Sequence, residues 1–139
     1  MTGVWVVLGA LAVATALGVL WRARQGRVHA VTSASTLPDE VRALLAPHPA
    51  VTLVQVSTTF CAPCRQARTL LAELADRTAG LHHAELDVTD RPDLAKAVAV
   101  LSTPTTLAVD AHGTELARVR GIPNRATLLD ALRPHLPAA

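Results

Sequence analysis

Residues 50–80 decide the fold and read AVTLVQVSTTFCAPCRQARTLLAELADRTAG. Ala50–Val56 is nearly all apolar and rich in β-branched residues, which predicts a strand buried on both faces. Behind the two cysteines, apolar residues recur at the i, i+3, i+4, i+7 and i+8 spacing of an amphipathic helix: Ala67, Leu70, Leu71, Leu74 and Ala75. Gly80 ends that helix. The stretch therefore predicts a buried strand, a turn with two cysteines and a helix.

Upstream of this unit the sequence predicts one more strand and one more helix. The strand is a short edge strand at Val28–Val31, and a polar loop over 32–36 follows it. The helix begins at Pro38, where a first turn tolerates proline, and is stopped by Pro47 and Pro49.

Downstream, strand and helix patterns continue to alternate. A strand is predicted at Ala84–Val88, and then a helix at Pro92–Leu101 that turns three side chains inward: Leu94, Val98 and Leu101. Two strands joined by a turn at His112–Gly113 follow, at Thr105–Val109 and Glu115–Arg120. Asn124 caps a last helix whose core-facing side chains are Leu128, Leu129, Leu132 and Leu136. The order β-α-β-α-β-α-β-β-α predicts an α/β domain with a central mixed β-sheet flanked by helices.

The N-terminal segment has the composition of a membrane-spanning helix. No charged residue occurs from Gly3 to Trp21, and at about 1.5 Å per residue this span rises roughly 28 Å, close to the ~30 Å of a hydrocarbon core. Trp5 and Trp21 bracket it, as interfacial anchors do. A buried core helix is the alternative, but such a helix has no evident partner at the N-terminus. We therefore expect a transmembrane helix over 1–22, a basic juxtamembrane linker over 23–27 and a soluble domain over 28–139.

Charge bias predicts how this helix is oriented. No lysine or arginine precedes the span, whereas Arg22, Arg24 and Arg27 follow it. The positive-inside rule then places the C-terminal domain in the cytoplasm, with the extracytoplasmic face as the alternative. A cleaved signal peptide would need a basic N-terminal region and a shorter apolar core. The formal net charge of +2, without a dense basic patch, argues against nucleic-acid binding.

Cys61 and Cys64 are the two cysteines of the chain. A disulfide between them would close a very short loop and stabilise the fold little, so the pair indicates chemistry. Cys61 comes at the N-terminus of the predicted helix, where unpaired N–H groups and the helix dipole favour a thiolate. Pro63 falls in the first turn, where its missing N–H costs nothing. Cys64, one turn further on, is close enough to attack a mixed disulfide at Cys61.

Two motifs resemble the thioredoxin family. Residues 60–65, Phe-Cys-Ala-Pro-Cys-Arg, are similar to the family's aromatic-Cys-Gly-Pro-Cys-basic motif. Residues 102–105, Ser-Thr-Pro-Thr, are similar to its Thr-Pro-Thr segment, which carries a cis-proline facing the cysteines. Gly121 falls where the family has a glycine beside its substrate groove. The resemblance covers Arg27 to Leu136 and implies a thioredoxin-like fold with a cis bond before Pro104.

The resemblance also implies a thiol–disulfide oxidoreductase that reduces protein disulfides. Cys61 would be the nucleophile and Cys64 the resolving thiol, with the substrate held by the residues around them: Phe60, Pro63, Thr103, Pro104 and Gly121. Such a cycle needs no cofactor and no metal on this chain, and an external donor such as a thioredoxin reductase or a membrane thiol carrier would supply the electrons. The Ala-Pro dipeptide between the cysteines resembles the Gly-Pro of reducing family members, which favours a reductase.

Some positions depart from the family's pattern. Gln55 stands where the family often has a buried aspartate that serves proton transfer to the resolving thiol, and Glu85 is nearest to the place of its lysine partner. Ser57 and Phe60 replace tryptophans usual nearby. Because glutamine cannot shuttle a proton near neutral pH, deprotonation of Cys64 would need water or another base. We expect exchange chemistry to survive with an altered rate and redox poise.

Two other interpretations compete with the enzyme. Cys61, Cys64, His82 and His83 could supply four zinc ligands, but adjacent histidines lack the usual spacing and point to opposite faces of a strand. The two histidines are better interpreted as strand-edge surface residues. A non-catalytic adaptor of the same fold could bind a partner at the membrane, although retention of both cysteines and of the Thr-Pro pair argues against it.

Overall fold

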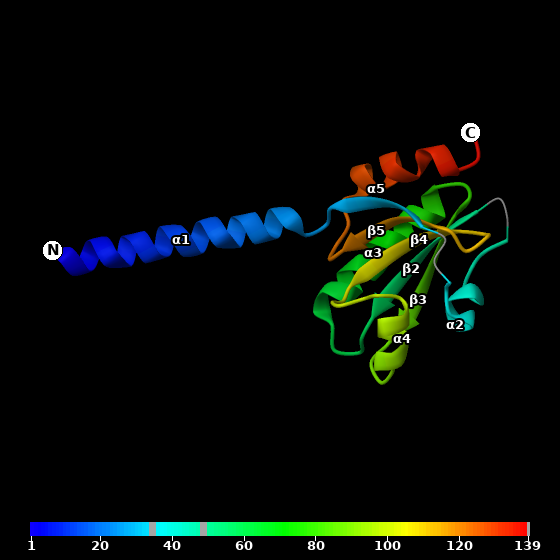
Figure 1. The fold of residues 1–139 in the computed structure, drawn as a ribbon. Coiled ribbons are helices and arrows are strands. Elements are labelled where there is room, and N and C mark those ends of the chain that lie inside the picture. The colour runs from blue at the N-terminus through cyan, green and yellow to red at the C-terminus, as the bar shows by residue number, and fades with distance from the viewer. Residues whose placement is uncertain (34–35, 48–49, 139) are drawn as a thin grey trace.

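A computed structural model of the chain describes residues 1–33, 36–47 and 50–138. The predicted loop residues 34–35 and Pro49 lie outside these ranges. One long helix extends away from a domain in which helices cover both faces of a sheet (Figure 1). In chain order the elements are α1 (Thr2–Arg24), β1 (Val28–Ser33), α2 (Asp39–Arg42), β2 (Val51–Ser57), α3 (Ala62–Arg77), β3 (Leu81–Asp87), α4 (Pro92–Ala97), β4 (Thr105–Asp110), β5 (Glu115–Arg120), α5 (Arg125–Leu132) and a 3-10 turn, Arg133–His135.

The described strands form one mixed sheet in the order β1-β5-β4-β2-β3. β2 runs parallel to β3 and antiparallel to β4, while β5 is antiparallel to both β4 and β1. Every residue of β2 is buried, which explains why its sequence is apolar without alternation. The predicted central mixed sheet is confirmed, and so is the position of the first strand at its edge.

Side chains that alternate along β2 divide the interior into two cores. One core lies between the sheet, α3 and α5, and includes Val51, Leu53, Leu71, Leu74, Leu128 and Leu132. The other lies between the sheet, α2 and α4, and includes Val41, Val54, Val56, Leu94 and Val98. Because full burial of such a side chain contributes about 1.5–3 kcal/mol, the two cores fix β2 and hence the loop that follows it.

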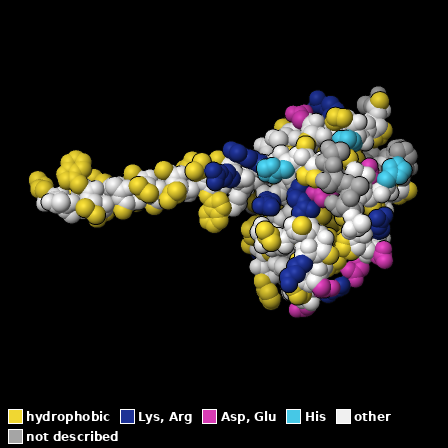
Figure 2. All heavy atoms as spheres, viewed as in Figure 1, with side chains coloured by type: hydrophobic (Ala, Val, Ile, Leu, Met, Phe, Trp, Pro, Cys, Tyr) yellow, Lys and Arg dark blue, Asp and Glu magenta, His cyan; other side chains and the backbone are white. Residues whose placement is uncertain are grey.

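α1 projects from the domain, and none of its side chains is buried. Figure 2 shows hydrophobic side chains along its length and basic side chains where it meets the domain. Its 23 residues are long and apolar enough to cross a membrane, a test that an N-terminal signal sequence also passes. The predicted apolar helix is therefore present, and it takes in Arg22 and Arg24 as its last turn.

α4 ends earlier than its sequence predicts. α4 stops at Ala97 instead of Leu101, because Ala99 adopts a left-handed backbone conformation with φ 52°. The N–H groups of Ala99 and Val100 bond back to carbonyls of the last turn, which is the Schellman pattern of a helix C-terminus. Val100 thereby takes the buried position, while Leu101 is 89% exposed. The prediction that Leu101 faces inward was wrong.

Two strands are longer than predicted, because backbone pairing rather than side-chain pattern sets their ends. β1 continues to Ser33, through residues that the sequence predicts as loop, because Ser33 pairs with Glu115 of β5. β3 begins at Leu81 instead of Ala84, because it already pairs there with the first residue of β2. The longer β3 matters for function, since it places both neighbouring histidines within the strand.

Candidate active site

The two cysteines lie where β2 ends and α3 begins. Cys61 is the N-cap of α3, and its Sγ accepts a hydrogen bond from the backbone N–H of Cys64 at 3.2 Å. The two sulfurs are 2.02 Å apart in a disulfide, so the structure represents the oxidised form. Cys61 is 9% exposed and Cys64 is 1% exposed. Cys61 is therefore the more accessible of the two residues.

The loop before β4 packs against this disulfide. The peptide bond between Thr103 and Pro104 is cis, as the resemblance predicts. The Thr103 hydroxyl lies 3.7 Å from Cys61 Sγ, toward which it can donate, and 3.5 Å from the Thr58 hydroxyl. The carbonyl of Pro104 accepts a hydrogen bond from the N–H of Gly121 at 2.8 Å. The structure thus brings these predicted contact residues together beside the accessible sulfur.

The other two predicted contact residues lie on the surface, Phe60 before the cysteines and Pro63 between them. Pro63 is exposed in the first turn of α3, and Phe60, which directly precedes Cys61, is 94% exposed. Leu101 is exposed in the loop that leads to Thr103. Large apolar side chains gain free energy only when something covers them. Phe60 and Leu101 therefore offer apolar surface on the two segments that flank the disulfide.

Gln55, at the position of the family's aspartate, is fully buried and hydrogen-bonded at both ends of its amide. Its Nε2 donates to the carbonyl of Cys64 at 2.8 Å, and its Oε1 lies 3.0 Å from Nε2 of His83 on β3. Because the amide nitrogen donates, the amide oxygen must accept, and His83 carries its proton on Nε2. Burial lowers the pKa of the His83 imidazole. A glutamine and a histidine thus connect the backbone of Cys64 to β3.

A charged cluster lies next to this pair, between β2, β3 and α3. The Ser57 hydroxyl donates to the Glu85 carboxylate at 2.5 Å, and Arg68 of α3 binds the same carboxylate through Nε at 2.6 Å and Nη2 at 2.5 Å. The hydrogen bond from Arg68 is the main cause that lowers the pKa of Glu85, and the one from Ser57 adds to it. Glu85 is thus a weak proton acceptor that ties α3 to β3.

His83 and Thr58 belong to the site, although the sequence analysis gave neither a role in disulfide exchange. His82 and His83 are predicted as surface residues, but only His82 is exposed, and the prediction for His83 was wrong. Because β3 begins at Leu81, its residues 81, 83 and 85 share the face that α3 covers. The spacing of two between His83 and Glu85 was the available signal. Within the described ranges, no three His, Cys, Asp or Glu side chains gather closely enough to hold a metal.

Comparison with known proteins agrees with this geometry. The family model for thioredoxin matches residues 32–134, which take in the whole site. This chain belongs to the thioredoxin family. A thioredoxin of Mycobacterium tuberculosis is 35% identical over 86 residues, which are 61% of this chain and 73% of that protein. Thioredoxin-2 of Pyricularia oryzae is 34% identical over 80 residues, 58% of this chain and 44% of the fungal protein.

Solved thioredoxin structures share the fold of this family member. A mutant thioredoxin from Halobacterium salinarum aligns with a TM-score of 0.61 at 21% identity, covering 76% of this chain and 90% of that one. The thioredoxin-like fold predicted from the sequence is therefore confirmed. With its Cys61–Cys64 disulfide at the strand–helix junction, this member of the thioredoxin family is a thiol–disulfide oxidoreductase. The 80 residues matched to the fungal relative span less than half of that protein, and the family model leaves out α1.

Proposed function

We propose that the chain is a membrane-anchored protein-disulfide reductase. The Cys61 thiolate attacks one sulfur of a substrate disulfide, the other substrate sulfur leaves as a thiolate, and a mixed disulfide forms. Cys64 then attacks Cys61 Sγ, which releases the second substrate thiol and forms the Cys61–Cys64 disulfide. The substrate gains two electrons and the cysteine pair loses two. An external donor, such as a thioredoxin reductase or a membrane thiol carrier, returns them.

The position of Cys61 Sγ is the observation that carries this proposal. It is the N-cap of a 16-residue helix, it receives the N–H of Cys64, and the Thr103 hydroxyl approaches it from the opposite loop. Hydrogen-bond donors and a helix N-terminus both stabilise negative charge on sulfur. In the reduced protein these groups stabilise the Cys61 thiolate, which favours Cys61 as the attacking sulfur. They also favour Cys61 as the sulfur that becomes a thiolate again when the Cys61–Cys64 disulfide is reduced.

Substrate would bind along the loop that carries the cis-proline. Thr103 lies beside Cys61 and Gly121 is bonded to Pro104, so an extended peptide could pair with the backbone of this loop as an added strand. Phe60 and Pro63 would cover the apolar part of that peptide. These contacts are outside the covalent step, so they affect protein substrates more than small disulfides.

The anchor and its orientation belong to the same proposal. α1 would cross the membrane, with Arg22 and Arg24 at its cytoplasmic end and the domain in the cytoplasm. If the domain instead faces the extracytoplasmic side, the chain is an extracytoplasmic thiol reductant, and its donor must be a membrane thiol carrier.

Reduction of a protein disulfide tests the activity. The full-length chain in nonionic detergent, with dithiothreitol as the donor, should reduce the insulin disulfides faster than a Cys61→Ser variant does. A Cys64→Ser variant should accumulate a mixed disulfide with the substrate, visible on a non-reducing gel. A rate no higher than that of Cys61→Ser would contradict the enzyme and favour the adaptor, which binds partners in the groove without turnover.

A further inference from the structure

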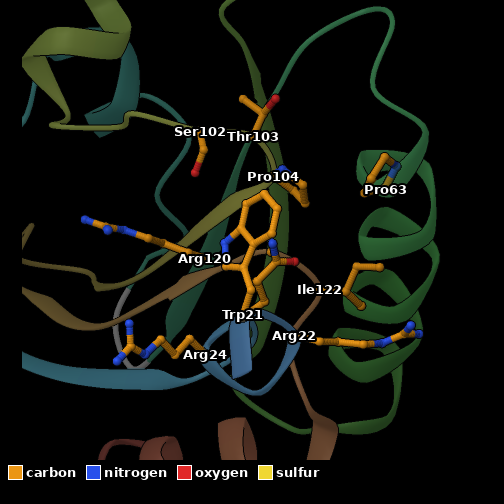
Figure 3. A pocket seen from close by; sticks show the side chains of 11 residues that line it. Trp21, Arg22, Arg24, Pro63, Ser102, Thr103, Pro104, Arg120 and Ile122 are labelled. Carbon is orange, nitrogen blue, oxygen red and sulfur yellow. The ribbon is translucent and has the colours of Figure 1, made fainter. Parts of the chain in front are cut away.

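A cavity of about 810 Å³ lies between the end of α1 and the active-site loop, a volume within the ~300–1,000 Å³ usual for ligand-binding clefts. Trp21 and Arg24 line it from α1, and Thr103 and Pro104 line it from the loop beside Cys61. In Figure 3 the Trp21 ring lies between the two sides. The cavity therefore continues the space in which the substrate disulfide would be attacked.

The linker after α1 is packed against the domain, which keeps this wall of the cavity in place. The N–H of Gly26 donates to the carbonyl of Arg120 at 2.8 Å, and so extends the pairing of β1 with β5. A Cβ at Gly26, where φ is 76°, would come within 2.7 Å of the Ile122 carbonyl oxygen. A Cβ at Gly121 would meet the Gln25 side chain at 3.4 Å. A close backbone approach at Gly26 and a side-chain contact at Gly121 thus hold the end of α1 beside the loop that carries the cis-proline.

The cavity is lined by positive charge. Arg22, Arg24 and Arg120 line it, and no aspartate or glutamate does among the described residues. In the described part of the chain none of the three guanidinium groups pairs with a carboxylate, whereas most other arginines of the domain do. In Figure 3, Arg24 and Arg120 extend to the same side of Trp21. Two guanidinium groups without a carboxylate partner, in a cavity that Thr103 and Pro104 also line, fit a carboxylate-bearing ligand.

We propose that this cavity binds an acidic segment of the protein substrate, next to the cysteine that Cys61 attacks, with its carboxylates paired with Arg24 and Arg120. The inference rests on the proposed function and adds a substrate class to it. A peptide is favoured over a lipid headgroup because the cavity is continuous with Thr103 and Pro104, so one extended chain at about 3.3 Å per residue fills both. The anchor helix is then part of the substrate site as well as a tether.

Matched peptide disulfides test the site. The two peptides share one sequence except beside the cysteine, where one has Asp-Glu and the other Asn-Gln. The pre-reduced full-length chain in nonionic micelles is mixed with each, and the single-turnover rate of disulfide cleavage is measured at low salt. The acidic peptide should react about threefold to fivefold faster, as one or two exposed ion pairs allow, and added salt should reduce that ratio.

Arginine variants show where the preference arises. Arg120→Gln and Arg24→Gln should each move the acidic-to-amide rate ratio toward one, and because the readout is a ratio, a general loss of activity cancels. Arg133→Gln, at the far end of α5, removes the same charge and should keep the wild-type ratio. A ratio of one in the wild type, or a ratio that both cavity variants retain, overturns the site.

Lipid vesicles and an uncharged disulfide distinguish the peptide site from a lipid site and from inactive thiols. In vesicles of phosphatidylcholine the ratio should persist, and it should also persist when phosphatidylglycerol is added. Loss of the ratio with phosphatidylglycerol would show that lipid headgroups take the arginines, and would overturn the peptide site. Hydroxyethyl disulfide, which is uncharged, reports on the thiols alone. If the chain cleaves hydroxyethyl disulfide but the two peptides react at equal rates, only the acidic site is refuted. If hydroxyethyl disulfide is cleaved no faster than by the Cys61→Ser variant, the proposed function itself is refuted.

Discussion

At Cys64 the backbone carbonyl is held by the Gln55 amide, and the same amide is held by His83. Both bonds are between neutral groups as long as His83 is unprotonated, and Gln55 has no exposed surface at all. A buried amide whose N–H and C=O groups are both hydrogen-bonded stabilises the site. Loss of one partner leaves a buried polar group unpaired and lowers the free energy of unfolding by about 1–3 kcal/mol. The resolving cysteine is therefore positioned by a hydrogen-bond chain that ends at one partly buried histidine, whose protonation would place a charge in this chain.

The stability of the fold should depend on pH through His83. Burial lowers its pKa below the ordinary 6.5 despite the opposite effect of Glu85, while Arg68 lowers it further. Folding thus favours the neutral imidazole, and the unfolded chain takes up the proton first as pH falls. The contribution of His83 to the free energy of unfolding should be fully present above about pH 6.5 and should decrease as the pH falls below that value. Urea unfolding of the full-length chain at about pH 7.5 and pH 5.5 measures the decline, in a range above most carboxylate titrations.

Two histidine variants identify the group. His83→Gln keeps a donor for Gln55 without a titratable proton, so it should lose less stability than the wild type between the two pH values. His82→Gln, on the exposed face of the same strand, should lose as much as the wild type. Equal declines in all three proteins would mean that His83 does not control the pH dependence.

Among the elements, α4 ends in an unusual way. Ala99 occupies the left-handed position that a Schellman motif usually gives to glycine. Arg118 of β5 holds this turn by donating to the carbonyls of Val98 at 3.0 Å and Ala99 at 2.9 Å. The turn directs the chain into the loop of Thr103, so the conformation of Ala99 helps to place the active-site loop.

Replacing Ala99 by glycine should stabilise the protein. The left-handed conformation costs an L-residue roughly 1–2 kcal/mol, and glycine loses roughly 0.5–1 kcal/mol more backbone entropy on folding. The Ala99 side chain is exposed, so no packing is lost, and a net gain of about 0.5–1 kcal/mol remains. Ala97→Gly, also exposed but helical, is the matched control and should lose about 0.5–1 kcal/mol. Denaturant unfolding of both variants decides, and a loss in Ala99→Gly equal to that in Ala97→Gly would contradict a strained backbone at Ala99.

The sequence predicted each element of the described fold but not all of their ends. Apolar periodicity located α3 and β2 because it reflects burial directly. It failed at Leu101, because the left-handed turn at Ala99 depends on contacts with Arg118 and no glycine marks it. It failed at His83 because the face of β3 that α3 covers is fixed by register with β2, which is a tertiary property. The resemblance of the two motifs to the thioredoxin family, in contrast, was enough to predict that Pro104 faces Cys61.

On the scale of the whole molecule, the end of α1 and the active site meet at one corner of the sheet. β1 pairs with β5, and this pairing brings the end of α1 to Gly121 and so to the loop of Pro104. The sequence predicted both the apolar helix and the site, but it treated residues 23–27 as a linker between them. Their contact depends on backbone pairing between distant segments, which no local pattern reveals. The proposed anchoring through α1 would therefore hold the active-site loop close to the membrane surface.

The side of the membrane on which this corner lies should be the cytoplasmic one, because Arg22, Arg24 and Arg27 follow the apolar span and no lysine or arginine precedes it. We expect a cysteine introduced at Ala138, in a chain with Cys61→Ser and Cys64→Ser, to resist an impermeant maleimide in intact cells and to react after permeabilisation. A cysteine introduced at Thr2 in the same background is the control and should react in intact cells. The reverse pattern would place the domain outside, where only a membrane thiol carrier could return its electrons. A chain that is shorter than the full length and carries no label from Thr2→Cys would mean that α1 is removed as a signal sequence. That result would refute the membrane anchor.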